Sequence, residues 1–558
     1  MSRIAEIEPA ETLAGKLAEL VHRDEGAVDY GSLLEALARR QARRHGLAEE
    51  TAGGSPAEEA LAQLAGELGA DEFEAMLDDP HLLGWFHQHV GEPERAESHR
   101  AHNRDEAKHD SQSTTTQLYT PRWIADALTQ AALEGAEPDA PTVLDPAVGG
   151  GQFLLAAYDA IAGREPGAEP EEIVGRLRGV DVDARAVRVA RRALKLRVAR
   201  HAGGRRPEAE ALVERQIRPG DGLFDEIPAA DVVLTNPPYM GSRSMPGELK
   251  SRIRQEFEPF HGDLYAAFID RCHRLARSRV GVLAQQTIWY LKRFRRAREA
   301  LLERGALELF VHLGPHACAS LTGEKANVVG FVQRSGAESA DAGDAPAPRF
   351  VDLREIASPA EMRDRLAAEL REVGERTRRL SVDELSVIPG SPVSHWLSAA
   401  LRRHFDGGRR LGDVAEIPGS QNKTGANREY VRDWREVPGA ALHRAPMELP
   451  VDGAPRRLAP GEGARWIFYS KGGRYAPWWG NWQNVVDWSP EAREFYDDNS
   501  TSNLLDERYR FRQAICYTDF VGRDFNARWM PPGCLFDMAG PAIFREVDLF
   551  ALLALLNC

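Results

Sequence analysis

Four residues near the middle of the chain, Asn236-Pro237-Pro238-Tyr239, combine groups that suit chemistry on a planar amine. The exocyclic amine of a nucleobase is a poor nucleophile, because its lone pair is delocalised into the ring. Two acceptors aimed at its hydrogens, the Asn236 side-chain oxygen and the Pro237 carbonyl, would localise that lone pair and stabilise the charge that develops during attack. Tyr239 offers a flat face on which a base can stack. The alternative is an ordinary turn, because Asn and Pro are common turn residues.

The residues before this tetrapeptide predict how it is held. Asp231 to Thr235 is an apolar run with β-branched residues, typical of a buried strand. The two prolines end this strand, because proline cannot continue a ladder and keeps the backbone extended. We therefore expect Asn236 and Tyr239 on a stiff loop at the carboxyl end of a strand, where open α/β sheets bind their ligands.

A strand, a glycine loop and a helix are predicted upstream, at 142–155. The glycines allow the backbone to pass close to a bound ligand. The loop lacks both the G-x-G-x-x-G pattern of dinucleotide sites and the Lys-Ser/Thr of a P-loop. Asp145 ends the strand, and its charge would repel a phosphate but suits a cationic amino-acid ligand.

Three acidic residues follow the next two predicted strands. Asp181 ends the second strand, and Asp183 directly precedes a helix that begins at Ala184. A carboxylate at the end of a second strand can accept both ribose hydroxyls of an adenosine-type ligand, whereas one beside a helix start is often an N-cap. We expect Asp183 to be the cap and Asp181 to meet the ribose. Asp221, after a third strand, is expected to accept from the amine of an adenine ring or to stabilise a turn.

The following segments continue the alternation between strand and helix patterns. Together with the four strands that end near 145, 181, 219 and 235, apolar runs at 280–283, 307–313 and 327–332 make seven predicted strands. Seven strands with intervening helices indicate a parallel-rich, Rossmann-like α/β sheet. We assign this predicted catalytic domain to residues 111–335.

Three further regions flank it. Leucines at helical spacing predict a helical domain at 1–110, and a Ser, Gly, Ala and Pro-rich stretch opens a linker and helical connector at 336–410. Residues 411–558 are rich in Trp, Tyr, Asn, Gly and Pro, which indicates an irregular β-rich domain. Its aromatic and basic side chains could stack bases and contact phosphates, or simply fill a small β core. Its last segment, Leu549 to Cys558, is an apolar helix pattern without a C-terminal cap, so we expect this domain to be incomplete.

Composition limits the classes of protein and of site. The 558 residues include no run of about 18 apolar residues and no signal-peptide core, so no membrane association is expected. Five cysteines without a C-x-x-C pair argue against disulfides and zinc and favour a reducing cytoplasm. His99, His102 and His109 lack partners at ligand spacing, so no metal is expected.

Charge is unevenly distributed along the chain. The net charge of −14 does not by itself indicate nucleic-acid binding. A basic stretch between Arg185 and Arg206 is interpreted as a solvated helix face. A second basic cluster, Lys292-Arg293-Phe294-Arg295-Arg296, follows the tetrapeptide and could contact phosphates.

The chain contains, in order, Tyr119-Thr120-Pro121, Asp145-Pro146-Ala147 with the glycines after it, Asp181, Asp221 and Asn236-Pro237-Pro238-Tyr239. Taken together, these motifs resemble those of S-adenosylmethionine-dependent amino-methyltransferases that act on DNA, in the order of the gamma class of N6-adenine methylases. Further segments resemble the PglX-type methyltransferases of BREX phage-exclusion systems. The segments that carry this second resemblance are Leu83 to Gln88, Thr235 to Ser242, Asp263 to Tyr265 with Phe268 and Ile269, Gly323-Glu324, Val328 to Val332, Thr424-Gly425, Asn427, Trp434, Lys471 to Gly473, Trp479 to Asn481, Phe536-Asp537, Gly540 and Leu552 to Asn557.

The resemblance implies a class I methyltransferase fold and roles for individual residues. It implies S-adenosyl-L-methionine contacts at Tyr119, Thr120, Pro121, Asp145, Ala147, Gly149, Asp181 and Asp221. It implies a target-base site at Asn236, Pro237, Pro238 and Tyr239. The usual Gly-Ser-Gly of the cofactor loop is Gly149-Gly150-Gly151 here, which keeps room for the backbone and loses a hydroxyl.

The sequence therefore predicts site-specific transfer of a methyl group from S-adenosylmethionine to adenine N6 in double-stranded DNA, with the base flipped out, in a phage-defence or restriction-modification system. Other defence-system proteins are expected as partners, and the recognition sequence and oligomeric state stay open. One alternative is methylation of an RNA base or a protein glutamine, since the tetrapeptide suits any planar amine or amide. N4-cytosine methylation is less favoured, because Ser more often begins that tetrapeptide. Another alternative is a non-catalytic, cofactor-binding subunit of a defence complex.

Overall fold

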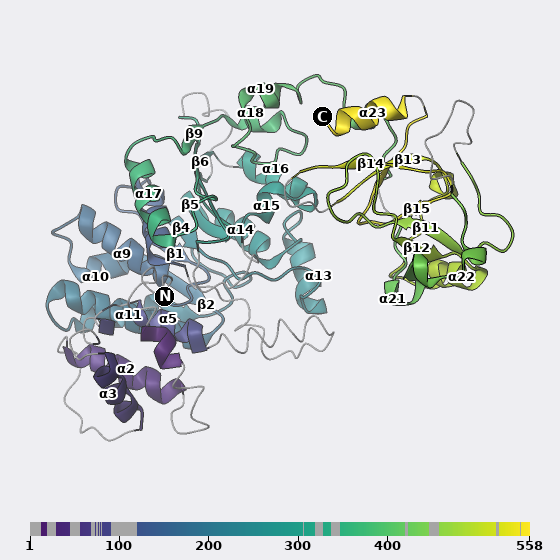
Figure 1. Ribbon diagram of the computed structural model, residues 1–558. Coiled ribbons are helices and arrows are strands. Elements are labelled where there is room, and N and C mark those ends of the chain that lie inside the picture. Colours follow the sequence, from purple (N-terminus) through teal and green to yellow (C-terminus); the bar gives the residue numbers. More distant parts are fainter. Residues whose placement is uncertain are drawn as a thin grey trace. The chain divides into compact units, whose positions relative to one another are not determined.

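The computed structural model describes most of the chain in two compact units, Met1–Asp406 and Gly407–Cys558 (Figure 1). The described residues are 13–18, 30–44, 56–68, 73, 76–77, 79, 81–90, 120–304, 306–317, 327–335, 346–418, 422–445, 457–519, 524–546 and 548–558. Within these residues, no helix combines the length and apolar character needed to cross a bilayer.

A nine-stranded sheet organises the first unit, with strand order β3-β2-β1-β4-β5-β7-β6-β8-β9. Five neighbouring strands, β3, β2, β1, β4 and β5, run parallel to one another, whereas β7 is antiparallel to both of its neighbours, β5 and β6. Their bounds are β1 Val143–Asp145, β2 Leu177–Asp181, β3 Ile217–Pro219, β4 Ala230–Thr235, β5 Ala276–Gln285, β6 Leu307–Gly314, β7 Val328–Arg334, β8 Arg349–Asp352 and β9 Thr377–Arg379.

This order confirms the expected class I methyltransferase fold. All seven strands expected from the sequence form, and the reversed β7 inserts between β5 and β6. Two further strands, β8 and β9, extend the sheet beyond β6. They come from the 336–410 stretch, which was expected to hold a linker and helices and which also supplies helices α17 Pro359–Arg371, α18 Val382–Ser386 and α19 Ala399–Arg403.

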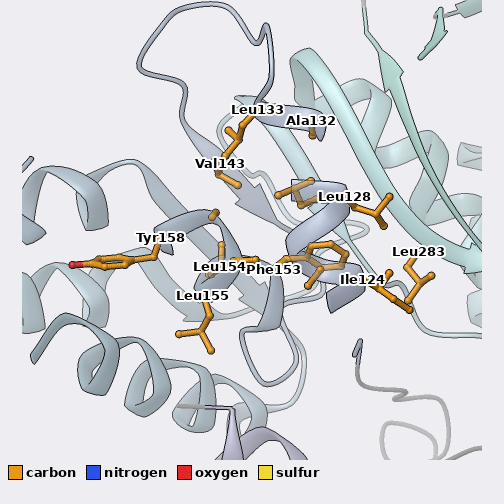
Figure 2. Close-up of a cluster of buried hydrophobic side chains, with 14 of the residues drawn as sticks. Ile124, Leu128, Ala132, Leu133, Val143, Phe153, Leu154, Leu155, Tyr158 and Leu283 are labelled. Atoms are coloured by element: carbon orange, nitrogen blue, oxygen red, sulfur yellow. The ribbon is translucent and has the colours of Figure 1, made fainter. Parts of the chain in front are cut away.

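Helices cover both faces of the sheet, as parallel strands buried on both faces require. One cluster of apolar side chains packs α8 Arg122–Leu133 and α9 Gln152–Arg164 against the strands. Figure 2 shows Ile124 and Leu128 of α8 beside Leu283 of β5, with Phe153 and Leu154 of α9 next to them. Other helices of this region are α10 Pro170–Gly175, α11 Ala184–Ala202 and α12 Pro207–Gln216.

A second apolar cluster joins β4 and β5 to the helices that follow them. It contains Val233 of β4, Phe268 of α14 and Trp289 of α15, all buried. The elements of this region are α13 Gly247–Glu256, α14 Leu264–Leu275, α15 Thr287–Tyr290, the 3-10 turn η3 Lys292–Phe294 and α16 Arg295–Arg304. This cluster fixes the loops that leave β4 and β5 at their carboxyl ends.

The N-terminal helices are amphipathic and share a third apolar cluster. Leu13, Leu17, Leu33 and Leu37, which recur at helical spacing in the sequence, are all fully buried there. Val189 of α11 belongs to the same cluster, so the N-terminal helices pack against α11, one of the helices that cover the nine-stranded sheet. Their bounds are α2 Tyr30–Arg44, α3 Pro56–Leu68 and α5 Leu82–Val90.

The second unit contains two small sheets, one of four strands and one of three. Its short strands alternate with turns, and aromatic side chains such as Trp529, Tyr469 and Phe536 fill its interior. Its elements are α20 Leu411–Val414, α21 Asn427–Tyr430, β10 Val431–Asp433, η5 Trp434–Glu436, η6 Gly439–Ala441, β11 Trp466–Ser470, β12 Asn484–Asp487, α22 Pro490–Asp498, η7 Glu507–Tyr509, β13 Ala514–Tyr517, β14 Ala527–Met530, β15 Leu535–Phe536, β16 Ala542–Ile543 and α23 Leu549–Leu556.

Candidate active site

The two predicted functional loops leave neighbouring strands at the same edge of the sheet. β1 and β4 are parallel and hydrogen-bonded, with Leu144 opposite Val233. Between them the strand order reverses, because β2 and β3 lie on one side and β5 on the other. Asp145 ends β1, and Asn236 directly follows β4. Both therefore lie at the switch point where open α/β sheets bind ligands.

At the amino ends of β1 and β4, reciprocal hydrogen bonds between Thr142 and Asp231, here called the Thr142–Asp231 latch, fix the register of the two strands. Asp231 Oδ2 accepts hydrogen bonds from the Thr142 backbone N–H at 2.9 Å and from its hydroxyl at 2.7 Å. The Asp231 N–H in turn donates to the Thr142 hydroxyl at 3.0 Å. This reciprocal pair ties the entry of β1 to the entry of β4.

The loop after β1 is held open by its own carboxylate and glycines. Asp145 is buried, and its Oδ1 accepts from the Ala147 N–H at 3.0 Å. Burial raises the pKa of Asp145 to about 7, and the nearby Asp181 charge acts in the same direction. Gly149 has a φ of +50°. A Cβ at Gly149 would meet only the Ala147 carbonyl, at 4.0 Å, so the backbone leaves room above this loop for a ligand.

Asp181 ties this glycine loop to the end of β2. Its Oδ2 accepts from the Gly149 N–H at 2.9 Å, and its Oδ1 accepts from the Asp183 N–H at 2.9 Å. Asp183 caps α11 by accepting from the Arg185 N–H at 2.8 Å, as the sequence predicts. Each carboxylate oxygen has a second lone pair, so Asp181 keeps the capacity to accept from ribose hydroxyls.

The loop after β3 packs directly against the loop after β1, with Gly222 next to the Pro146 carbonyl. A Cβ placed at Gly222 would lie 1.7 Å from the Pro146 carbonyl oxygen, so only glycine fits. Asp221 Oδ1 accepts from the N–H groups of Leu223 and Phe224, at 2.9 and 3.2 Å. Asp221 therefore stabilises a turn. The contact of the Asp221 carboxylate with an adenine amine stays a prediction.

The loop after β4 pairs its two functional side chains with each other. The Tyr239 hydroxyl donates to Asn236 Oδ1 at 3.0 Å, and both side chains are half-buried beside the buried Pro237. The Tyr239 ring meets the ring of Tyr265 edge to face, with centroids 5.8 Å apart. The structure thus brings together the acceptor and the stacking ring that the sequence predicts.

A second set of residues, which the sequence reasoning did not single out for the site, holds this loop. Asp263 Oδ1 accepts from the Met240 N–H at 3.1 Å, and the Leu264 N–H donates to the Met240 carbonyl at 2.9 Å. Burial raises the pKa of Asp263 to about 6. Tyr265 is fully buried and its hydroxyl bonds the Thr287 hydroxyl at 2.6 Å. In the sequence, the Asp263-Leu264-Tyr265 triplet was noted only as part of the resemblance to PglX-type methyltransferases, which gave it no role in holding this loop.

The basic cluster 292–296 divides into two kinds of cation. Arg295 pairs with Glu299 at 2.8 Å and Arg296 pairs with Glu258 at 2.9 Å. In the described part of the chain, no carboxylate pairs with Lys292 or Arg293, and both are exposed. They flank Phe294, whose ring is buried with its centroid 6.1 Å from that of Tyr265. Two cations without an ion-pair partner among the described residues therefore lie next to the residues that hold the Asn236 loop, and the charge of Arg293 acts on the Asp263 carboxyl.

Other predicted residues have simpler positions. Tyr119, His99, His102 and His109 lie outside the described residues. Thr120 and Pro121 are buried directly before α8, and the Pro121 carbonyl accepts from the first turn of that helix. Their contact with a cofactor stays a prediction. Of the basic stretch 185–206, which was interpreted as a solvated helix face, Arg191 and Lys195 are half-buried and pair with Glu214 of α12, so this part of the stretch contacts a neighbouring helix.

Comparisons with known proteins agree with this geometry. Residues 176–318, which include β2 and the Asn236 loop, match the family model described as Eco57I restriction-modification methylase. The chain is 25% identical over 338 residues to the adenine-specific methyltransferase BrxX of Escherichia coli O9:H4 (strain HS), covering 59% of this chain and 25% of that protein. It is 26% identical over 352 residues to the adenine-specific methyltransferase PglX of Lacticaseibacillus casei (strain Zhang), covering 61% of this chain and 28% of that protein.

The matched region thus spans about a quarter of the length of these two curated relatives. Among solved structures, the type IIL restriction-modification enzyme MmeI in complex with DNA matches with a TM-score of 0.51 at 11% identity, over 98% of this chain and 84% of that one. This likeness supports the fold. The chain thus has a class I S-adenosylmethionine-dependent methyltransferase fold, its residues 176–318 match the model of a restriction-modification methylase, and its sequence is similar to PglX-type adenine-specific methyltransferases.

Proposed function

We propose that this protein transfers a methyl group from S-adenosyl-L-methionine to N6 of an adenine flipped out of double-stranded DNA. One observation carries the proposal: the Asp145 glycine loop and the Asn236 loop leave adjacent, hydrogen-bonded strands at the same sheet edge. A methyl donor and a planar amine held on these two loops would meet at the switch point of the sheet.

The loops after β1, β2 and β3 suit the donor. In this proposal Asp181, at the end of β2, accepts from ribose hydroxyls, and the buried Asp145 carboxylate faces the cationic part of the ligand. Gly149 and Gly222 keep the backbone free of side chains where the loops approach each other. When bound, S-adenosylmethionine would supply an electrophilic methyl group on its sulfonium.

The loop after β4 suits the acceptor base. Asn236 Oδ1 and the Pro237 carbonyl accept from the adenine amine and localise its lone pair toward the methyl group. Before the base arrives, Asn236 Oδ1 accepts from the Tyr239 hydroxyl instead. An incoming amine replaces one hydrogen bond with another, so Asn236 is never left without a donor. Tyr239 then stacks its ring on the base, supported at its edge by Tyr265.

Phage defence or restriction-modification is the proposed context of this methylation. The curated relatives are adenine-specific methyltransferases named BrxX and PglX, and the family model is that of a restriction-modification methylase. In this proposal the second unit, residues 407–558, contributes to recognition of the target sequence. Other proteins of the same defence system are proposed as partners.

The decisive experiment compares acceptors with a labelled cofactor. The wild-type protein should label adenine N6 in duplex DNA, and it should label RNA and protein far less. Asn236→Ala should lower methyl transfer by about 100- to 1,000-fold, the cost of removing one such electrostatic donor or acceptor. Its affinity for the cofactor should stay unchanged, as measured by calorimetry.

Two results would contradict the proposal. Methyl transfer by the Asn236→Ala variant at the wild-type rate would exclude the role of Asn236. Labelling of RNA or protein in preference to duplex DNA would assign the same site to a different acceptor.

A further inference from the structure

A loop of the second unit, residues 471–482, exposes large aromatic side chains on a strained backbone. Tyr475, Trp478 and Trp479 are 61%, 50% and 41% exposed. Scattered apolar side chains on a surface are ordinary, but these three lie within five residues of one another. The loop therefore presents a concentrated aromatic surface, of which Trp479 also packs against core residues while Tyr475 and Trp478 are the most exposed.

The backbone of this loop adopts a conformation that its residues disfavour. Trp478 has a φ of +74° and Asn481 a φ of +63°. A left-handed conformation is a genuine outlier for a bulky side chain such as that of Trp. Such strain persists only where the surrounding structure over-determines it, and it gathers at functional sites.

The neighbouring strand over-determines Trp478. The Trp478 N–H donates to the Ala527 carbonyl at 2.8 Å, and the Trp478 carbonyl accepts from the Trp529 N–H at 3.0 Å. Both partners belong to β14. The backbone of Trp478 is thus fixed from both sides, while its indole ring is half exposed.

The rest of the loop is equally rigid. The buried Asn481 side chain donates to the Arg474 carbonyl at 3.0 Å, which closes the loop on itself. Trp479 packs its ring beside those of Trp482 and Trp529, with centroids 5.8 and 5.6 Å apart. A rigid loop loses little conformational freedom on binding, which favours affinity.

A cation accompanies these rings. Arg474 is exposed, and among the described residues no carboxylate forms an ion pair with it. The neighbouring Lys471 differs, because it pairs with Asp537 at 3.0 Å. Exposed aromatic rings beside an unneutralised Arg are the groups that bind nucleic acids, since the rings stack on bases and the guanidinium contacts phosphates.

We propose that the 471–482 loop is a base-stacking site for DNA, in which the Trp478 indole stacks on a nucleobase and Arg474 contacts a phosphate beside it. This inference rests on the proposed function, because DNA is the substrate proposed there. It adds a contact outside the Asn236 loop and explains why the unit maintains an exposed tryptophan in a disfavoured conformation.

The test compares Trp478 with a matched exposed tryptophan of the same unit. Trp434 is 45% exposed and is not among the residues with positive φ. Trp478→Ala should weaken binding of a fluorescent duplex with a short single-stranded segment, which offers an unstacked base, by about 5- to 150-fold, the range expected from loss of one base stack. Trp478→Phe should recover most of the affinity, whereas Trp434→Ala should bind DNA like the wild type. Fluorescence anisotropy at fixed salt measures all four proteins.

A second substitution separates lost binding from lost folding. Trp478→Gly removes the ring but suits a φ of +74°. It should therefore melt at or above the wild-type temperature and still bind DNA as weakly as Trp478→Ala. A fall in both melting temperature and affinity would assign Trp478 to folding and overturn the inference.

Wild-type affinity for DNA in Trp478→Ala would also overturn it. So would loss of binding to a defence-system protein with DNA affinity intact, which would make the loop a protein contact. Failure of the proposed function has a different signature. In that case the wild-type protein would transfer no methyl group to DNA, whatever residue 478 is.

Discussion

The two halves of the proposed active site use their polar groups in different ways. On the cofactor half, Asp145 and Asp181 direct carboxylate oxygens at backbone N–H groups of the glycine loop. On the base half, Asn236 and Tyr239 direct their polar atoms at each other. The first arrangement fixes the backbone of the glycine loop, where the cofactor is proposed to bind. In the second arrangement, the Tyr239 hydroxyl donates to Asn236 Oδ1, the same atom that is proposed to accept from the substrate amine.

This difference indicates two modes of preorganisation. In the proposed function, the contacts that build the cofactor half persist when the ligand binds, so substitutions there should affect folding and cofactor affinity. The base half would exchange an internal hydrogen bond for one to the substrate, so substitutions there should affect turnover and DNA affinity and leave folding intact. Four predictions test this division, from the largest expected effect to the smallest.

Gly222→Ala should disrupt the cofactor half most. Its Cβ would lie 1.7 Å from the Pro146 carbonyl oxygen, and a backbone atom cannot move away cheaply. We expect a loss of about 1–3 kcal/mol in the free energy of unfolding, as for an overpacked core, together with weaker cofactor binding. Urea unfolding and calorimetry measure these quantities. Gly167→Ala, where a Cβ meets nothing within 4 Å, is the control and should change neither.

Asp145→Asn should change the pH dependence of stability. The pKa of this carboxyl is about 7 in the folded protein, against about 3.9 in an unfolded chain. Between these values the folded state binds more protons, so ionisation of Asp145 lowers the free energy of unfolding as pH rises. The asparagine variant should therefore gain stability relative to the wild type from pH 5 to pH 8. Urea unfolding at several pH values checks this difference.

Asp352→Asn provides the opposite case. The pKa of Asp352 is lowered to about 2, since Arg354 hydrogen-bonds its charged form and outweighs the effect of burial. It is fully ionised throughout pH 5 to 8, so its substitution should give a constant difference across that range. If the stability difference between Asp352→Asn and wild type rose with pH, or if that of Asp145→Asn stayed constant, the pH dependence would not come from ionisation of Asp145.

Two substitutions at Tyr239 should separate the ring from the hydroxyl. Tyr239→Phe removes the hydroxyl that donates to Asn236 Oδ1 and keeps the stacking face, so KM for DNA should stay near the wild-type value. Tyr239→Ala removes the ring and should raise KM by an amount equivalent to about 1–3 kcal/mol. Steady-state kinetics with duplex DNA distinguish the two. Equal losses would show that the hydrogen bond, rather than the ring, positions the base.

The salt dependence of DNA binding should show whether Lys292 and Arg293, next to the base half, contact DNA phosphates. Lys292→Gln with Arg293→Gln removes two unpaired cations, so the slope of log affinity against log salt should fall by about 1.8. Arg295→Gln with Arg296→Gln removes two cations already paired with Glu299 and Glu258, and should change the slope less. Anisotropy titrations at several salt concentrations measure both. Equal slopes for the two pairs would remove Lys292 and Arg293 from the interface.

The sequence predicted the local structure of the sheet well, because strand ends, glycine loops and caps depend on near neighbours. Asp183 capping α11 is one such case. The direction of β7 and the addition of β8 and β9 were not predictable, since a short apolar run does not encode which partner it pairs with or in which direction.

The same limit applies to the site. Asn236 and Tyr239 are three residues apart, and their types together with the motifs upstream predicted a joint role for them. Asp263 and Thr287 support them from 24 and more residues away, so only the folded structure shows their contacts. The left-handed conformation of Trp478 was also hidden, because hydrogen bonds to β14 impose it against the preference of the residue.

The Thr142–Asp231 latch has a consequence for the transfer itself. A slip of one residue between β1 and β4 would move Asn236 about 3.3 Å along its strand and turn its side chain to the opposite face. In the proposed function, two side chains at the amino ends of these strands therefore set the distance between methyl donor and acceptor base at the carboxyl ends. Neither Thr142 nor Asp231 is proposed to touch the substrate.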